Sequence, residues 1–163
     1  MQNSLAMGEH TVYLQITETE STFTFKQPGI TKVTLPVGFG LVSNAYFKHT
    51  PPTYSEIEYA INFIEDEIEK IVPMIPVDGF RLVSETPFIK GMASLAGVSD
   101  SDEMILSRDS LECLFGLYAE IAMGKRPSAY EPDISPKFYA QLLMLREFMH
   151  HLKFAQITTT PTW

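Results

Sequence analysis

The amino-acid sequence predicts an α+β fold, in which about three helices cover a mostly antiparallel sheet. Alternating apolar and polar residues fill positions 11–36, and long amphipathic patterns follow at 53–71, 107–124 and 136–153. One further strand-like segment, 80–84, lies between the first two of these helices. The expected order is therefore three strands, a helix, a strand and two helices. The whole chain, 1–163, is expected to form a single globular domain.

Three short segments near the N-terminus have the alternation of strands that bury one face. The apolar positions are Val12, Leu14 and Ile16 in the first segment, Phe23 and Phe25 in the second, and Val33 and Leu35 in the third. Residues 17–21 and the Pro28–Gly29 pair provide the turns between them. The segments predict a three-stranded antiparallel meander with one apolar face.

The first predicted helix begins at Thr53. Thr53 and Glu56 have the spacing of a capping box, in which each side chain accepts a hydrogen bond from a backbone N–H of the other residue. Isoleucines at alternating spacings of four and three residues then form one apolar stripe, made of Ile57, Ile61, Ile64, Ile68 and Ile71. The remaining faces are rich in Glu and Asp, so this helix is expected to bury one side only.

Several segments give weaker predictions. Residues 37–42 are expected to be a bent strand or the wall of a loop. Close backbone packing or a β-bulge explains Gly38 and Gly40 better than a phosphate-binding loop, whose motif is missing. Residues 85–106 have no pattern that decides their structure. Residues 1–10 are expected to be a loose lead-in and residues 155–163 a tail. The tail is rich in threonine, which would suit an edge strand.

Two helices flank a polar, proline-broken connector at 124–136. The first ends at Gly124, which is typical of a C-cap, and the second begins with Ser135 as N-cap and Pro136 in its first turn. The second helix is apolar over more of its circumference than one core contact needs. Leu143, Met144 and Phe148 make up this surplus, which is either core buried on two sides or an interface with a second copy or another protein.

Composition excludes several classes of partner. The formal net charge of −8, from 20 acidic and 12 basic side chains, disfavours binding to nucleic acids and to anionic membranes. Cys113 is the only cysteine, so an intramolecular disulfide is excluded. The N-terminal residues lack the pattern of a secretory signal, and no apolar run approaches the roughly 20 residues of a spanning helix. A cytoplasmic protein is expected.

Since no coherent catalytic motif is present, the leading hypothesis is a non-enzymatic interaction or accessory module, chaperone-like or regulatory, without a cofactor. It is expected to form a homodimer through the C-terminal helix. The alternative is a small-molecule-binding protein or enzyme with a pocket near the 124–136 connector. Arg126, Tyr130 and Glu131 are the candidate ligand-binding residues there, since polar loops held by helices often carry function.

A third hypothesis is a metal site formed by Glu147 and His150. The Glu-x-x-His spacing occurs in carboxylate-bridged metal sites of helical bundles, but such sites need a second motif, which only a dimer would provide here. His151 lies four residues after Glu147, and a solvated pair between these two side chains is the simpler interpretation.

Overall fold

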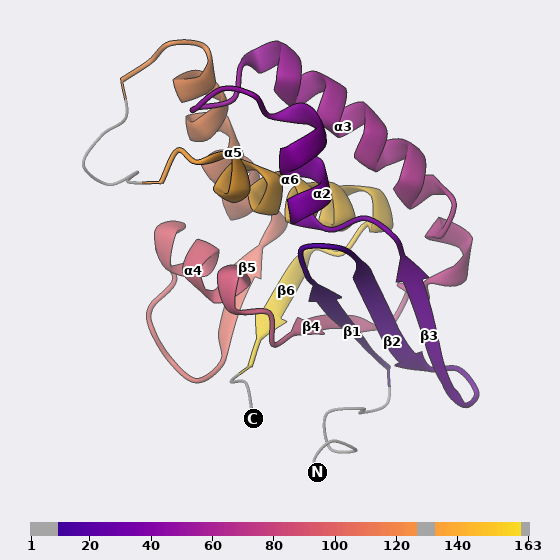
Figure 1. Cartoon of the computed structure of the whole chain (residues 1–163). Helices are drawn as coiled ribbons and strands as arrows, with labels where there is room; N and C mark the ends of the chain where they lie inside the picture. The colour runs from indigo at the N-terminus through magenta and orange to yellow at the C-terminus, as the bar shows by residue number, and fades with distance from the viewer. Residues whose placement is uncertain (1–9, 127–132, 161–163) are drawn as a thin grey trace.

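The computed structural model describes residues 10–126 and 133–160, which form one six-stranded sheet with helices packed on it (Figure 1). The strands are β1 Thr11–Ile16, β2 Ser21–Lys26, β3 Ile30–Leu35, β4 Arg81–Ser84, β5 Met104–Ser107 and β6 Gln156–Thr159. The α-helices are α2 Phe39–Tyr46, α3 Tyr54–Glu69, α4 Pro87–Leu95, α5 Arg108–Ala122 and α6 Pro136–Leu152, and a short 3₁₀ turn covers Val72–Met74. The strand order is β3-β2-β1-β4-β6-β5.

The predicted N-terminal meander is confirmed. β2 is antiparallel to β1 on one side and to β3 on the other, with Phe23 opposite Leu14 and Val33. These three side chains belong to the hydrophobic core, whereas Gln15, which points to the other face of β1, is exposed. The alternation in the sequence thus separates a face that the helices cover from a polar face.

The prediction of a mostly antiparallel sheet with about three helices is wrong. β4 is parallel to both β1 and β6, and five α-helices are present in the described residues. The sheet is therefore mixed, with antiparallel pairs only at its two sides. The physical reason is the connection between β3 and β4: the chain passes through α2 and α3 before it pairs with β1, and such helical crossovers bring strands in parallel.

Helix α2 lies in a segment that was expected to be a bent strand or a loop wall. No side chain caps its N-terminus. Instead, the N–H of Phe39 donates to the carbonyl of Thr17 at 3.1 Å, and the N–H of Gly40 donates to the carbonyl of Glu18 at 2.9 Å. The β1–β2 turn thus replaces a capping side chain. The predicted close packing at Gly38 is confirmed, because a Cβ there would overlap the backbone of Thr17 and Glu18.

The other unpredicted elements complete the far side of the sheet. Residues 85–106 contain α4 and the start of β5. The tail predicted at 155–163 contains β6, which is not an edge strand but lies between β4 and β5. Ile157 of β6 is accordingly fully buried. Residues 1–9, most of the predicted lead-in, lie outside the described residues.

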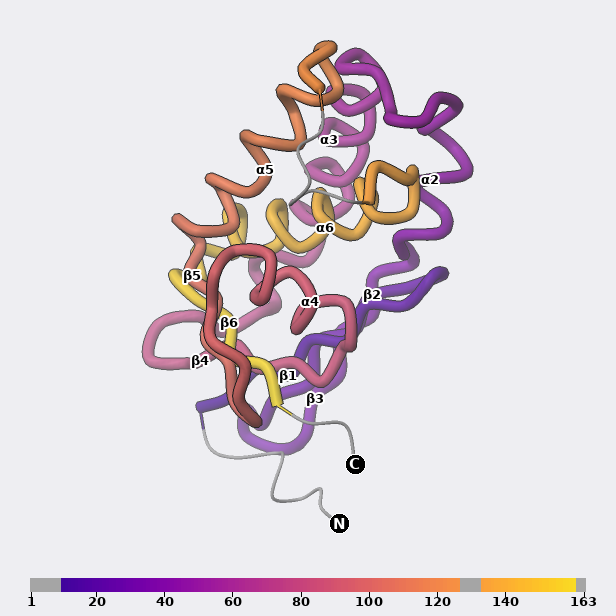
Figure 2. The backbone as a smooth tube through the Cα atoms, turned by 90° about the vertical axis from the view of Figure 1, so that its left-hand side faces the viewer, coloured from indigo at the N-terminus to yellow at the C-terminus, as the bar shows by residue number. Residues whose placement is uncertain are grey.

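Helix α6 lies in the middle of the helix layer. It contacts α2, α3, α4 and α5, and Figure 2 shows α2, α3, α5 and α6 together on one side of the strands. Leu143, Met144 and Phe148 are each 0% exposed within the single chain, and the ring of Phe148 packs edge-on against that of Phe23 at 5.1 Å. These three side chains therefore belong to the core and offer no surface to a partner. A homodimer stays a prediction that no observation on these residues supports.

The predicted helix starts are confirmed at three places. In the capping box of α3, the N–H of Glu56 donates to Thr53 Oγ1 at 3.1 Å, and the N–H of Thr53 donates to Glu56 Oε1 at 2.9 Å. At α5 and α6 the cap is a single hydrogen bond, in which Ser107 Oγ accepts from the N–H of Ser110 and Ser135 Oγ accepts from the N–H of Phe138. Of the helices described, none has both the length and the apolar composition that crossing a bilayer requires.

Loss of the capping box should weaken the fold measurably. We expect Thr53→Ala to lower the free energy of unfolding by about 1 kcal/mol, the usual cost of removing an N-cap side chain. Chemical denaturation checks this value. Ser55→Ala is the matched control, because Ser55 is exposed on the first turn of α3 and lies outside the capping box. Equal losses in the two variants would contradict a specific role of the cap.

A side chain at Gly38 should separate α2 from the β1–β2 turn. We expect Gly38→Ala to cost about 1–3 kcal/mol, because the clash is with backbone atoms that cannot rotate away. Gly29→Ala is the control, since a Cβ at Gly29 would meet no atom within 4 Å. Thermal melting of the two variants distinguishes them. A Gly38→Ala protein as stable as Gly29→Ala would show that the turn does not hold α2.

Candidate functional site

A groove lies over the C-terminal ends of β1 and β4, which are neighbours because the two strands are parallel. The larger of its two adjoining hollows, about 760 Å³, lies at these strand ends. The smaller, about 340 Å³, extends from there along the open face of β1 and β2, where Tyr13, Gln15 and Thr24 line it. The β1–β2 turn, the start of α4 and the first turns of α6 form the walls of the larger hollow. Ligands of open sheets with parallel strands usually bind beyond the carboxyl ends of those strands, so this groove is the candidate site.

Hydroxyl groups fix the backbone beneath the groove. Ser84 Oγ donates to the carbonyl of Leu14 at 2.6 Å and accepts from the N–H of Thr86 at 3.0 Å. The N–H of Ile16 donates to Thr86 Oγ1 at 3.3 Å. Thr17 Oγ1 accepts from backbone N–H groups two and three residues later, which stabilises the β1–β2 turn. The ends of β1 and β4 are thus held in a fixed relation to each other.

The groove collects polar groups from distant parts of the sequence. Lys137 is the single cation among its described lining residues, and its Nζ lies 5.8 Å from the ring centroid of Phe39. Gln141 lines the same wall one turn further along α6. Glu18 and Glu85 supply one carboxylate to each hollow. A cation and an amide suit an anionic group, and a carboxylate can accept a proton from an attacking water molecule.

The three ligand-binding residues predicted on the connector do not form this groove. Arg126 is exposed after the end of α5 and is not among the lining residues. Tyr130 and Glu131 lie outside the described residues, so their prediction stays untested. The lining residues come from four separate segments of the chain, and no local motif in the sequence connects them. Lys137 was not among the residues selected from the sequence, although it follows Ser135 and Pro136 in the first turn of α6, where a helix N-terminus favours anions.

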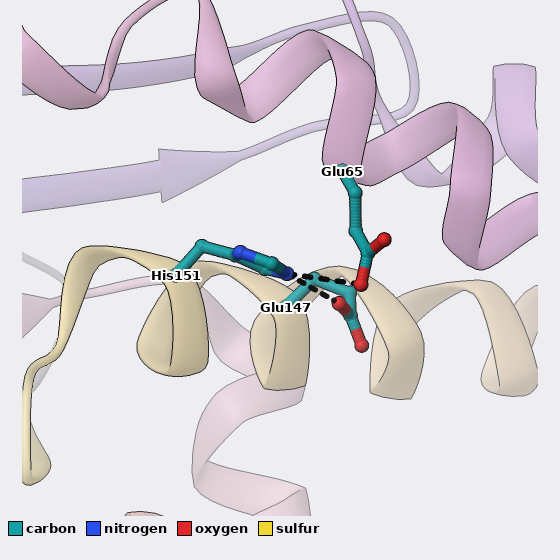
Figure 3. A group of neighbouring side chains, drawn as sticks. All are labelled: Glu65, Glu147 and His151. Carbon is teal, nitrogen blue, oxygen red and sulfur yellow. Dashed lines mark hydrogen bonds and ion pairs between the residues drawn. The ribbon is translucent and has the colours of Figure 1, made fainter.

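Glu147 meets His151 and Glu65 rather than His150 (Figure 3). His151 Nε2 lies 3.0 Å from Glu65 Oε2 and 3.2 Å from Glu147 Oε1. His150 is exposed, because adjacent residues of a helix point about 100° apart. The predicted contact of Glu147 with His151 therefore exists, but it is partly buried rather than solvated. A site that joins Glu147 and His150 across a dimer remains untested.

Glu147 is a charged residue in the core, with 1% of its surface exposed. Arg146 compensates it: Nη1 donates to Glu147 Oε2 at 2.7 Å, while Nε donates to Glu112 Oε1 at 2.7 Å. Burial is the main cause that raises the pKa of Glu147 to about 7. The negative charge of Glu65 raises it further, and the positive charge of Arg146 opposes both effects. Burial and Glu65 together thus outweigh Arg146, so the neutral acid is favoured below pH 7 and the anion above it.

Removal of Arg146 should destabilise the protein in a way that depends on pH. We expect Arg146→Met to cost about 3 kcal/mol above pH 7, because an ionised Glu147 then lacks its compensating cation. The carboxyl group has a pKa of 4.5 unfolded and about 7 folded. The preference of the fold for its neutral form is therefore complete below pH 4.5 and disappears as the pH rises through 7. The loss caused by Arg146→Met should accordingly be smaller below pH 5.

Urea denaturation of wild type and Arg146→Met, each measured below pH 5 and above pH 7, checks the prediction. Arg126→Met is the control, because Arg126 is exposed and should contribute little at either pH. A loss that does not change with pH would show that Arg146 acts through packing alone.

The fold resembles solved structures of the Ppx/GppA family. The type II variant of the Aquifex aeolicus Ppx/GppA phosphatase matches 97% of this chain with a TM-score of 0.76 and 17% identity. Another structure of the Aquifex aeolicus family member gives 0.76 at 18% identity, and an exopolyphosphatase from Cytophaga hutchinsonii gives 0.67 at 12% over 95% of this chain. The chain covers only 54–55% of these proteins, about half their length. No protein-family model and no curated protein matches the sequence.

These similarities overturn the expected non-enzymatic interaction or accessory module. That expectation, like the view that the chain is not an enzyme, depended on the lack of a contiguous catalytic motif. The chain instead has a fold found in phosphatases, with a groove assembled from four separate segments. Such an assembly leaves no motif in the sequence, so the lack of one is no argument against activity. The described chain has the fold of about half of a Ppx/GppA-like protein.

Proposed function

We propose that the chain is the half of a phosphatase that binds a phosphate chain, such as polyphosphate, in the groove beyond β1 and β4. The observation that supports this most is the similarity of fold over 97% of the chain to Ppx/GppA phosphatases. An exopolyphosphatase among the similar structures suggests the substrate class. The position of the groove, at the carboxyl ends of two parallel strands, suits a ligand with several phosphate groups.

In this proposal the groove residues divide the work of phosphoryl transfer. Lys137 binds a phosphate oxygen, and the amide of Gln141 orients it. Glu18 or Glu85 accepts a proton from the water molecule that attacks the terminal phosphorus. The bond from this phosphorus to the bridging oxygen breaks, and orthophosphate and the shortened phosphate chain are the products. Phosphoryl transfer depends mainly on positioning and on compensation of negative charge. The hydroxyl network under the groove would provide the positioning.

Compensation of charge is incomplete within this chain. The net charge is −8, and Lys137 is alone among the described lining residues as a cation. The similar structures are nearly twice as long as the part that aligns. We therefore propose that the missing cations come from another protein region or from a second copy of this chain. A homodimer formed through a surface other than Leu143, Met144 and Phe148, and a cytoplasmic location, are part of the proposal.

Lys137 provides the test. We expect Lys137→Ala to weaken polyphosphate binding about tenfold, which corresponds to a loss of roughly 1.4 kcal/mol, and to lower phosphate release in proportion. Calorimetry measures binding, and a colorimetric phosphate assay with magnesium in the buffer measures release. Lys153→Ala is the matched control, because Lys153 is an exposed lysine at the other end of α6.

The outcomes separate binding from catalysis. Equal effects of Lys137→Ala and Lys153→Ala would reject the groove as the binding site. Binding by the wild type without phosphate release would keep the groove and reject hydrolysis by this chain alone. A wild-type protein that neither binds nor cleaves polyphosphate would reject the whole proposal.

A further inference from the structure

We propose that Glu65, Glu147 and His151 bind one zinc ion between helices α3 and α6 (Figure 3). The ligands are Nε2 of His151 and one carboxylate oxygen from each glutamate, and these atoms all lie within 4.8 Å of one another. Imidazole nitrogen and carboxylate oxygen are ordinary zinc ligands, and three protein ligands leave the fourth position to water. The proposal does not depend on the phosphatase activity.

The spacing of the ligand atoms fits a tetrahedral ion. Zinc bonds to nitrogen and oxygen are about 2.0–2.1 Å long, which places neighbouring tetrahedral ligands roughly 3.3 Å apart. His151 Nε2 lies 3.0 Å from Glu65 Oε2 and 3.2 Å from Glu147 Oε1. Two of the three distances between ligand atoms are therefore already close to the tetrahedral value, and the third, between the two carboxylate oxygens, is within 4.8 Å and closes by rotation of the partly exposed Glu65 side chain.

Secondary structure explains why the three side chains converge. Glu147 and His151 are four residues apart on α6, which puts them on one face of the helix. Glu65 belongs to the acidic side of α3 and, as Figure 3 shows, reaches from that helix toward the pair on α6. Packing of α3 against α6 fixes the distance between the two helices. The site is thus built on rigid elements and not on loops.

The second oxygen of Glu147 already has a partner of the kind that supports metal ligands. Arg146 Nη1 binds Oε2 at 2.7 Å, which leaves Oε1 directed to His151. Arg146 is itself held by Glu112 and lies 4.0 Å from the ring centroid of Phe115. Such outer partners orient a ligand and raise metal affinity.

A divalent cation would also balance the charge of this site. Among the residues that the structure describes, Arg146 is the one cation beside the carboxylates of Glu65, Glu112 and Glu147, so with all three ionised and His151 neutral the group carries a net charge of −2. Zinc brings this charge to zero. Protons on His151 and Glu147 would do the same, and this metal-free arrangement is the competing explanation for the same contacts. Zinc binding distinguishes the two.

The site is accessible and separate from the groove. The side chains of His151 and Glu65 are 23% and 35% exposed, so an ion can enter from solvent. Lys137 and His151 are 14 positions apart on α6, which corresponds to about 21 Å along the helix axis. Zinc here would join α3 to α6 rather than take part in the proposed phosphate chemistry, and it should raise the stability of the fold.

The test is zinc titration of the full chain after dialysis against a chelator. We expect one zinc ion per chain, and a rise in melting temperature of about 5 °C or more at a free zinc concentration near 100 times the dissociation constant. Cobalt as a substitute should give the strong visible absorption of a tetrahedral site. His151→Gln and Glu65→Gln should each lower zinc affinity at least about tenfold and abolish this absorption.

His150→Gln is the matched control. His150 is on the same helix, next to His151, and is exposed, so this variant should bind zinc as the wild type does. Melting curves in chelator show whether each variant is folded. If His151→Gln is not folded, Glu65→Gln alone carries the test, because Glu65 is partly exposed. The proposal is overturned if the wild type binds no stoichiometric zinc, if folded His151→Gln or Glu65→Gln binds as tightly as the wild type, or if His150→Gln loses binding to the same extent.

Discussion

The burial of helix α6 is the constraint on which the rest of the structure depends. The helix lies between the sheet and the other helices, so 12 of its 17 residues are buried. A charged residue in such a helix has to find its partners inside the protein, which is why Glu147 contacts Arg146 and His151. The first turns of the same helix bring Lys137 and Gln141 to the groove. One buried helix therefore positions both candidate sites.

Sequence patterns predicted the elements whose form is decided locally. The meander, the start of α3 at Thr53 and the caps of α5 and α6 follow from alternation and from side-chain hydrogen bonds within a few residues. Helix α2 could not be predicted in this way, because carbonyls of Thr17 and Glu18 cap it from another part of the chain. β5 and β6 were not placed in the sheet from the sequence, although β4, which has four residues as they do, was predicted as a strand. Their partners are set by long-range packing, which leaves no local pattern.

The residues of the candidate sites are likewise brought together by long-range packing, which sequence patterns do not show. The sequence identified Glu147 as a residue that could bind a metal, but it paired Glu147 with His150 on the basis of a spacing found in other proteins. The structure selects His151, because that residue shares the helix face of Glu147 and faces α3. Glu65 was assigned only to a solvated acidic face, since nothing in the sequence shows which helix crosses it. The groove was missed for a related reason, as its residues are brought together by strand order alone.

The position of β6 has a consequence for how the protein is made on the ribosome. β6 separates β4 from β5, yet it follows α5 and α6 in the sequence, so it is translated after both of its neighbours. Until residues 156–159 emerge, the nascent chain has an open edge at β4, and β5 lacks the only strand that it pairs with among those described. Open strand edges are the usual starting points of aggregation. The open edges of β4 and β5 are therefore covered only after β6 has been synthesised.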